Sequence, residues 1–305
     1  MVQAYSIGKP GAKWELPERQ LWLEKQAVKR SYQEEVVSKV QKLAEDFEVL
    51  QYGALSYDKE RYPLLALKTH GFGKTGKPTV LITGGVHGYE TSGVQGALRF
   101  LESRAKDYAE DFDILVAPCV SPWGYETINR WNPNAVDPNR SFKKDTDSEE
   151  AAAIMKLVSS LESPVVMHLD LHETTDTDES EFRPALAARD GVEYVPDVVP
   201  DGFYTVGDTE NPQDDFQAAI IDSVRKVTHI APPDGKGLII GEPISQEGVI
   251  NYPLKSLGLC SSMTDAKFVS TTEVYPDSPK VTDAVCNEAQ VAAVTGALDF
   301  VKKSL

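Results

Sequence analysis

The hydrophobic positions of this chain change period repeatedly from one end to the other. Short apolar runs rich in β-branched residues, typical of buried strands, are followed by stretches whose apolar residues recur every three or four positions, typical of amphipathic helices. Strand-like runs span 50–59, 62–69, 79–83, 113–120, 164–172, 238–244 and 267–275, and helix-like stretches span 18–47, 91–106, 149–161, 215–228 and 280–303. Strands that alternate with helices predict an α/β fold with a mixed, largely parallel central sheet and helices on both faces.

The segments between these elements predict one domain over residues 1–305 with two additions. A helical segment at about residues 1–50, which begins with an extended arm, precedes the first strand. Residues 121–142 form a long loop rich in Pro, Asn, Trp and Arg, and a loop of this length in a compact domain is often functional. Residues 174–214 are acidic and interrupted by Pro and Gly, so we expect a surface excursion over the site.

The composition excludes several classes of partner. The chain has 305 residues and a net charge of -16, whereas nucleic acids and anionic membranes need a basic face. No apolar run of about 18 residues is present, and the first residues lack the pattern of a signal peptide. Cys119, Cys260 and Cys286 have no paired spacing, so we expect buried thiols and a cytoplasmic protein. The oligomeric state is not predicted.

The strand at 79–83 leads into the first candidate site. Two glycines follow it, and His87 and Glu90 then lie three residues apart just before a predicted helix. The carboxyl end of a strand in an open α/β sheet is where ligands bind, and an imidazole and a carboxylate in one tight turn can hold one metal ion. The alternative is a helix N-terminus at which Glu90 interacts favourably with the helix dipole.

A catalytic zinc needs a third protein ligand, and His172 is the best candidate. It ends the strand-like run 164–172 and precedes a polar loop, the same context as that of His87. His168 lies deeper in this strand and is better explained as a hydrogen-bonded core histidine. Ligating histidines usually donate their second N–H to a carboxylate, and Asp137 and Asp170 could both serve.

Three further side chains could act on a substrate. Glu273 ends the strand before Pro276 and could be a general base, although a solvated strand end is an equal alternative. Arg130 and Arg140 lie in the long loop of an acidic protein, where they could bind carboxylates through a two-pronged fork or form surface salt bridges.

The order of these groups along the chain resembles that of the zinc metallocarboxypeptidases of the M14 family, over roughly residues 55–300. The matching set is His87-x-x-Glu90, Val136 to Arg140, Asp170-x-His172 and Thr272-Glu273. The resemblance implies a zinc carboxypeptidase-like catalytic domain that binds one Zn²⁺ per chain through His87, Glu90 and His172, with Asp137 orienting His87.

The same resemblance implies roles in hydrolysis. Glu273 would be the general base, and Arg130 would polarise the scissile carbonyl and stabilise the oxyanion. Asn139 and Arg140 would bind the terminal carboxylate of a small peptide, which implies removal of the C-terminal residue. Tyr252 would cap the substrate pocket.

Other functions remain open from the sequence alone. The residues around His87 and His172 also resemble the deacylase branch of this superfamily, succinylglutamate desuccinylase and aspartoacylase, whose substrates are acyl amino acids. A two-metal aminopeptidase would hold a second ion through Asp170, His168 or Glu173. A non-catalytic module would bind a peptide C-terminus through Arg140 without hydrolysing it.

Overall fold

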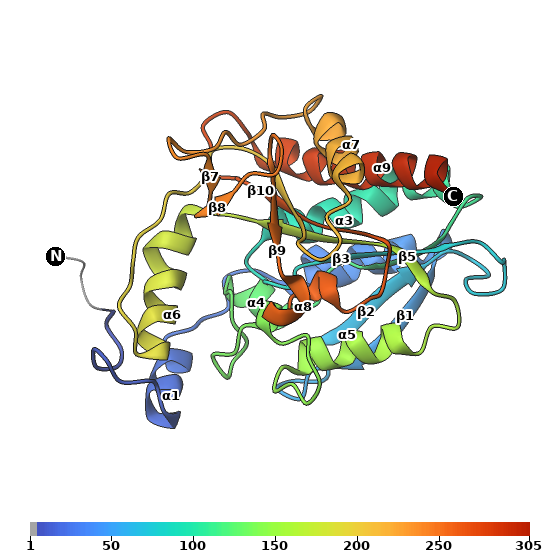
Figure 1. Cartoon of the computed structure of the whole chain (residues 1–305). Helices are drawn as coiled ribbons and strands as arrows, with labels where there is room; N and C mark the ends of the chain where they lie inside the picture. The colour runs from blue at the N-terminus through green and yellow to red at the C-terminus, as the bar shows by residue number, and fades with distance from the viewer. Residues whose placement is uncertain (1–4) are drawn as a thin grey trace.

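The centre of the molecule is a mixed eight-stranded sheet. The computed structural model describes residues 5–305, and the strand order is β1-β2-β4-β3-β5-β10-β6-β9 (Figure 1). The strands are β1 Glu48–Ala54, β2 Pro63–Lys68, β3 Thr79–Gly84, β4 Asp113–Ala117, β5 Val165–Glu173, β6 Tyr204–Asp208, β9 Val249–Tyr252 and β10 Phe268–Val274. The four central strands, β4, β3, β5 and β10, pair in parallel, and β6 pairs in parallel with β9. The β1–β2, β2–β4 and β10–β6 pairs are antiparallel. The predicted mixed, largely parallel sheet is confirmed.

Helices cover both faces of this sheet. In Figure 1, α3, α7 and α9 lie above it and α5 lies below it. The α-helices are α1 Leu16–Glu24, α2 Ser38–Lys42, α3 Thr91–Ser103, α4 Pro122–Thr127, α5 Glu149–Ser159, α6 Arg183–Asp190, α7 Asp214–Val224, α8 Leu254–Leu257 and α9 Asp283–Ser304. The shorter helical segments are η1 Gln33–Val37, η2 Leu43–Glu45, η3 Ala105–Tyr108, η4 Pro138–Arg140, η5 Asp178–Phe182 and η6 Cys260–Ser262.

Strand β3 is apolar along its length because both of its faces are covered. Its six residues are all buried. Val80 and Ile82 belong to the core on the side of α3, whereas Leu81 packs in a second cluster with Ile154 of α5. Burying each such side chain contributes roughly 1.5–3 kcal/mol, so this strand is a fixed platform for the turn that follows it.

The N-terminal segment packs on the long loop through tryptophans. The predicted helical segment of about residues 1–50 is helical from Leu16, and its first four residues lie outside the described part of the chain. The ring centroids of Trp22 and Trp131 are 5.4 Å apart, and Trp14 meets Trp131 edge-on at 6.1 Å. All three side chains belong to the main core, which favours the single domain that the sequence predicts.

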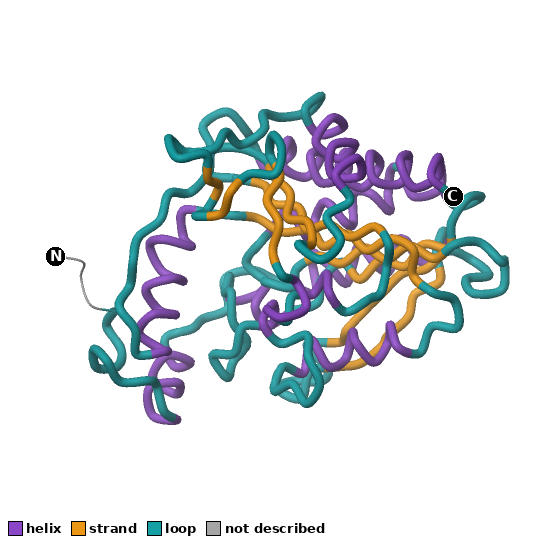
Figure 2. Tube along the Cα trace, in the orientation of Figure 1, coloured by secondary structure: helices purple, strands orange, loops and turns teal. Residues whose placement is uncertain are grey.

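The prediction for residues 174–214 is wrong in part. Strand β6 lies inside this segment and belongs to the central sheet, where Thr205 pairs with Thr272 of β10. The run is short and contains threonine and glycine, so its pattern does not stand out as a strand. The rest of the segment forms η5, α6 and a loop that returns alongside α6 (Figure 2).

Two other predictions need correction near the C-terminal strands. Residues 238–244 form a two-stranded hairpin, β7 Leu238–Ile239 and β8 Glu242–Pro243, because Ile240 and Gly241 both have positive φ, as in a tight hairpin turn. Strand β9, the last but one along the chain, was not predicted. The three cysteines are buried and unpaired, as expected. Within residues 5–305, no helix has both the length and the apolar character needed to cross a bilayer.

Candidate metal centre and substrate pocket

The candidate site lies at the carboxyl ends of three neighbouring parallel strands. His87 follows β3, His172 lies near the end of β5, and Glu273 pairs with His172 from β10. The turn after β3 has no room for larger residues. Gly85 has φ +59°, and a Cβ on Gly88 would lie 2.1 Å from the backbone nitrogen of Tyr125. The glycines therefore let the His87 turn pack directly against the backbone of α4.

His87, Glu90 and His172 converge on one point. Nδ1 of His87 lies 2.7 Å from Oε1 of Glu90, and Nδ1 of His172 lies 2.6 Å from Oε2 of the same carboxylate. The three side chains are buried, and one potential ligand atom from each lies within 4.8 Å of the other two. The Oε2 atom has no hydrogen-bond partner despite this short contact, so the geometry resembles ligands around a shared ion. This donor set fits the His₂Glu pattern of a catalytic zinc.

The charges of the trio are strongly coupled. Burial alone would raise the pKa of Glu90, but the imidazoles of His172 and His87 hold this pKa well below its usual range. Burial would lower the pKa of His172, whereas the carboxylates of Asp170 and Glu90 raise it well above its usual range. The carboxylates thus surround the imidazoles with negative charge, which favours binding of either protons or a cation there.

Each imidazole turns its other nitrogen toward a second carboxylate. Nε2 of His87 lies 3.0 Å from Oδ1 of Asp137, and Nε2 of His172 lies 2.7 Å from Oδ2 of Asp170. Asp137 is fixed by the backbone N–H of Asn139, and Asp170 by the hydroxyl of Thr83. Both aspartates named from the sequence therefore lie where they can orient a ligating histidine.

The side chains suggested for a second ion have other partners. Nε2 of His168 lies 3.0 Å from the hydroxyl of Thr83, and Glu173 accepts hydrogen bonds from the N–H groups of Thr91 and Ser92 at the start of α3. Over residues 5–305, the His87–Glu90–His172 trio is the one group of three or more such side chains close enough to share an ion. This arrangement argues against the two-metal aminopeptidase.

Glu273 faces the same pocket beside the trio. Its Oε2 accepts a hydrogen bond of 2.9 Å from the hydroxyl of Thr174, which also lies 2.7 Å from the hydroxyl of Tyr204. Burial raises the pKa of Glu273 to about 8, with the negative charge of Glu90 adding to the effect and His172 opposing it. A carboxyl group with a pKa near neutrality can both accept and return a proton.

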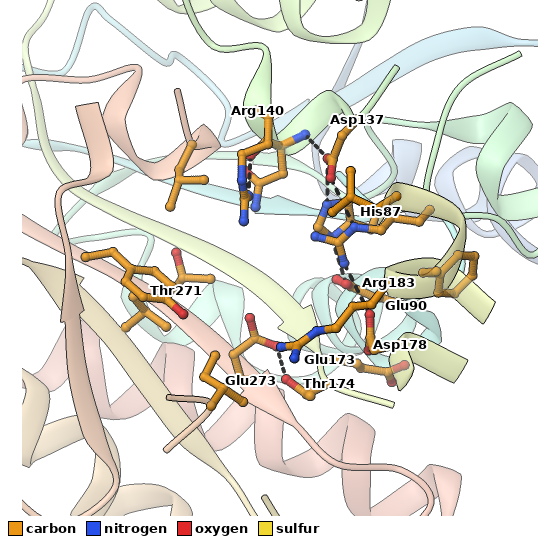
Figure 3. Close-up of a pocket in the computed structure, with 18 of the residues that line it drawn as sticks. His87, Glu90, Asp137, Arg140, Glu173, Thr174, Asp178, Arg183, Thr271 and Glu273 are labelled. Carbon is orange, nitrogen blue, oxygen red and sulfur yellow. Dashed lines mark hydrogen bonds and ion pairs between the residues drawn. The ribbon is translucent and has the colours of Figure 1, made fainter. Parts of the chain in front are cut away.

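The predicted substrate-binding residues line one cavity of about 400 Å³. They are Arg130, Asn139, Arg140 and Tyr252, together with Glu273. Figure 3 shows Arg140 and Thr271 on one side of this cavity, and His87 and Glu90 on the other.

The two predicted arginines differ in their partners. Arg130 donates from Nε to Asp137 at 3.0 Å and from Nη1 to Asp178 at 3.3 Å, so it is tied to the carboxylate that holds His87. Arg140 donates from Nη1 to the backbone oxygen of Asn139 at 2.7 Å, and within the described chain it pairs with no carboxylate. The guanidinium of Arg140 is therefore more available than that of Arg130 to bind a substrate carboxylate.

The side-chain amide of Asn139 is fixed through its oxygen atom. Its side-chain oxygen accepts a hydrogen bond from the N–H of Cys260, and its nitrogen lies 3.4 Å from Nε2 of His172. Tyr252 ends β9, and burial raises the pKa of its phenol to about 12, so it enters the pocket as a neutral hydrogen-bond donor.

Sequence reasoning missed the contribution of η5 and α6 to the pocket. Asp178, Phe182, Arg183, Leu186, Arg189 and Asp190 line it. Arg183 and Arg189 are the only basic residues between positions 174 and 213. Isolated cations in an acidic stretch are a signal that could have identified this wall of the pocket.

Comparisons with known proteins agree with this geometry. The family model for zinc carboxypeptidases, Peptidase_M14, matches residues 48–176, which include His87, Glu90, Asp137, Arg140 and His172. No curated protein sequence matches the chain.

Solved structures with similar folds include several of this family. A candidate metallopeptidase from Shewanella amazonensis SB2B has a TM-score of 0.62 at 19% identity, over 90% of this chain and 98% of that one. A metallo-carboxypeptidase from Pseudomonas aeruginosa, bound to (2-guanidinoethylmercapto)succinic acid, has a TM-score of 0.59 at 14% identity, over 88% and 68% of the two chains. Bovine thrombin-activatable fibrinolysis inhibitor, bound to a tick carboxypeptidase inhibitor, has a TM-score of 0.57 at 14% identity, over 97% and 99%.

At these identities the structural likeness establishes the fold, which is that of the zinc carboxypeptidases. The family model covers the segment that carries the trio and the long loop. The chain therefore has the zinc carboxypeptidase fold and matches the zinc carboxypeptidase family model over residues 48–176.

Proposed function

We propose that this protein is a zinc-dependent exopeptidase that removes the C-terminal residue of small peptides. The observation that carries the proposal is the meeting of the His87–Glu90–His172 trio, Glu273 and the guanidinium of Arg140 around one cavity. A metal, a base and a cation for the terminal carboxylate are the groups that such a reaction requires.

His87, Glu90 and His172 would hold the zinc ion. When bound there, zinc would act as a Lewis acid toward the scissile carbonyl and would lower the pKa of water at the site. Asp137 and Asp170 fix the orientation of the two imidazoles through the hydrogen bonds described above.

Glu273 would take a proton from the attacking water and return it to the leaving amine. Its carboxyl group has one hydrogen bond to the protein, from Thr174, and this bond leaves the other oxygen directed to a substrate. Because its pKa of about 8 refers to the site without a cation, a bound Zn²⁺ would lower this pKa and favour the basic form.

Arginine side chains would provide the remaining contacts with the substrate. Arg130 has Nη2 available to donate to the carbonyl oxygen as negative charge develops there. Arg140 and the amide nitrogen of Asn139 would bind the terminal carboxylate, and Tyr252 would cover the bound residue. A fixed cation for the carboxylate explains why cleavage would be restricted to the chain end.

An N-acyl amino acid deacylase is the second candidate. It would use the same trio, the same base and the same carboxylate site. The small cavity, which α6 closes on one side, favours short substrates and so suits either reaction.

The decisive experiment compares short peptides with N-acyl amino acids as substrates, with and without a metal chelator. We expect hydrolysis of peptides that chelation abolishes and added zinc restores. Glu273→Gln should lower kcat by at least about 100-fold with little change in fold. Glu288→Gln, which changes an exposed carboxylate paired with Arg99, is the matched control and should keep full activity. Binding of peptides without any hydrolysis would replace the proposal with the non-catalytic module.

A further inference from the structure

Four arginines line the cavity, and two of them have no free pair of adjacent donors. Arg130 uses Nε and Nη1 for Asp137, Tyr89 and Asp178. Arg189 donates to the carboxylate of Asp190 from Nε at 2.9 Å and from Nη2 at 3.2 Å, and its Nη1 donates to the backbone oxygen of Ala135. Neither guanidinium offers a free pair of adjacent donors to a ligand.

Arg140 and Arg183 are different. Each donates from Nη1 alone, Arg140 to the oxygen of Asn139 and Arg183 to Glu179 and Asp197. Among the described residues, no acceptor meets Nε or Nη2 of either side chain. Nε and Nη2 form the edge of a guanidinium that binds a carboxylate through two parallel hydrogen bonds. The cavity therefore has two open carboxylate-binding edges.

Arg183 is anchored so that its open edge stays in the cavity. Nη1 lies 2.7 Å from Oε1 of Glu179, and the other oxygen of Glu179 accepts hydrogen bonds from the hydroxyl of Tyr194 and the N–H of Asp197. The side chain of Arg183 is 34% exposed and lines the cavity. A guanidinium that is already fixed at one nitrogen loses less conformational entropy when it binds a ligand.

The carboxylates of the cavity are occupied by groups other than Arg183. Asp178 accepts from Tyr89 and Arg130, Asp190 from Arg189, and Glu273 from Thr174. Among residues 5–305, neither these carboxylates nor any other pairs with Nε or Nη2 of Arg183. An anion from solution is the group that fits it.

The two open edges face different parts of a bound substrate. In Figure 3, Arg140 lies next to Asp137 at the top of the cavity, whereas the side chain of Arg183 extends toward Glu273 and Thr174 from the other side. If Arg140 binds the terminal carboxylate, Arg183 lies toward the acyl part of the substrate, beyond the scissile bond. Both cations also oppose the rise in the pKa of Tyr252 that burial causes, so both lie near this phenol.

We infer that Arg183 forms a second anion subsite, which binds a carboxylate on the acyl side of the substrate. The inference rests on the proposed function and narrows it, because the favoured substrates are acidic on both sides of the bond that is cleaved. A peptide with an acidic penultimate residue and an N-acyl amino acid with a carboxylate on its acyl group share this chemistry.

The test compares Glu-Leu with Gln-Leu, two peptides of nearly equal shape that differ by one charge. We expect the wild-type kcat/KM to be about 10- to 100-fold higher for Glu-Leu, the range of a charge-assisted bidentate contact. Arg183→Ala should reduce this ratio to about one. Arg183→Glu should invert the preference, so that Lys-Leu becomes better than Glu-Leu. A gain of activity on Lys-Leu cannot arise from a folding defect.

Arg225→Glu is the matched control for the change in charge. Arg225 follows α7 and pairs with Glu247 as Arg183 pairs with Glu179, but it lies outside the cavity. The Glu-Leu preference should persist in this variant. A preference that survives in Arg183→Ala, or that is lost equally in Arg225→Glu, would refute the subsite.

A binding measurement separates this inference from the proposed function. Calorimetric titration of the full chain should give a lower Kd for glutarate than for butyrate, and Arg183→Ala should bring the two Kd values together. Equal efficiency on Glu-Leu and Gln-Leu in an active enzyme would refute the subsite and leave the exopeptidase intact. Failure to hydrolyse any peptide would refute the exopeptidase, and the glutarate titration would then decide the subsite.

Discussion

At the scale of single residues, the chemistry of the site depends on which charged side chains have an oppositely charged partner within the protein. Glu273 has a hydrogen bond from Thr174 but forms no ion pair among the described residues, and burial raises its pKa from 4.5 to about 8. Without the positive charge of a bound Zn²⁺, the carboxyl group of Glu273 stays protonated near neutral pH. The pKa of Glu273 therefore reports whether the site holds Zn²⁺.

This raised pKa makes the stability of the metal-free protein depend on pH. The unfolded chain loses the Glu273 proton near pH 4.5, whereas the folded chain keeps it up to about pH 8. The stabilising contribution is complete below pH 4.5 and is lost as the pH rises through 8. In denaturant titrations without metal, the free energy of unfolding of wild type should therefore fall relative to that of Glu273→Gln between pH 4.5 and about 8. Parallel stability curves for the two proteins would contradict the shift.

Asp137 links the metal trio to Arg130, and its charge should matter to both. One oxygen contacts Nε2 of His87 and the other accepts from Nε of Arg130. Asp137→Asn keeps the shape but weakens both contacts, so we expect the affinity for zinc to fall about 10- to 100-fold in competition with a chromogenic chelator. Asp46→Asn, which changes an exposed carboxylate paired with Lys106, should leave zinc affinity unchanged.

At the scale of elements, the hydrophobic pattern predicted the parts of the fold that are buried on both faces. The buried strands β3, β5 and β10 stand out as short runs rich in apolar and β-branched residues, so the strand ends that carry His87, His172 and Glu273 were found from the sequence. Strand β6 and the α6 wall were missed because their short, mixed runs acquire structure from tertiary contacts. The role of Arg183 was missed for the same reason, since its open edge depends on partners in η5 and on residue Asp197.

The position of α6 depends on the glycine that ends it. Gly191 has φ +67°, and a Cβ there would lie 2.8 Å from the backbone of the N-terminal arm at Ala12. Gly191→Ala should therefore lower the free energy of unfolding by about 1–3 kcal/mol, from the left-handed backbone and the displaced arm. Since α6 carries Arg183, the KM for acidic peptides should rise more than kcat falls.

Gly235→Ala is the control for this change of residue type. Its Cβ would meet nothing within 4 Å and its φ is not positive, so its unfolding curve should match that of wild type within about 0.5 kcal/mol. Equal effects of the two substitutions would show that the contact between α6 and the arm does not determine stability.

At the scale of the whole molecule, the trio joins segments that are far apart in the sequence. His87 and Glu90 belong to the turn between β3 and α3, whereas His172 belongs to β5, and α3 packs against β5 and α9 on one face of the sheet. An ion held by all three side chains would bind the folded chain and not the unfolded one. Its binding free energy is thus added to the stability of the entire sheet.

Zinc should therefore raise the thermal stability of the protein in a way that requires the complete trio. At a free zinc concentration about 1,000 times Kd, the free energy of unfolding should rise by about 4 kcal/mol. For a chain of this size we expect Tm to increase by roughly 6 °C, as measured by calorimetry with buffered zinc. Substitution of His172 by Ala removes one ligand and should abolish most of this increase, measured relative to the Tm of the same variant without zinc. Substitution of His229 by Ala, which removes a histidine paired with Asp201 outside the cavity, should keep it. An increase that both variants retain would mean that zinc binds elsewhere, and the trio would then lose its role as the metal centre.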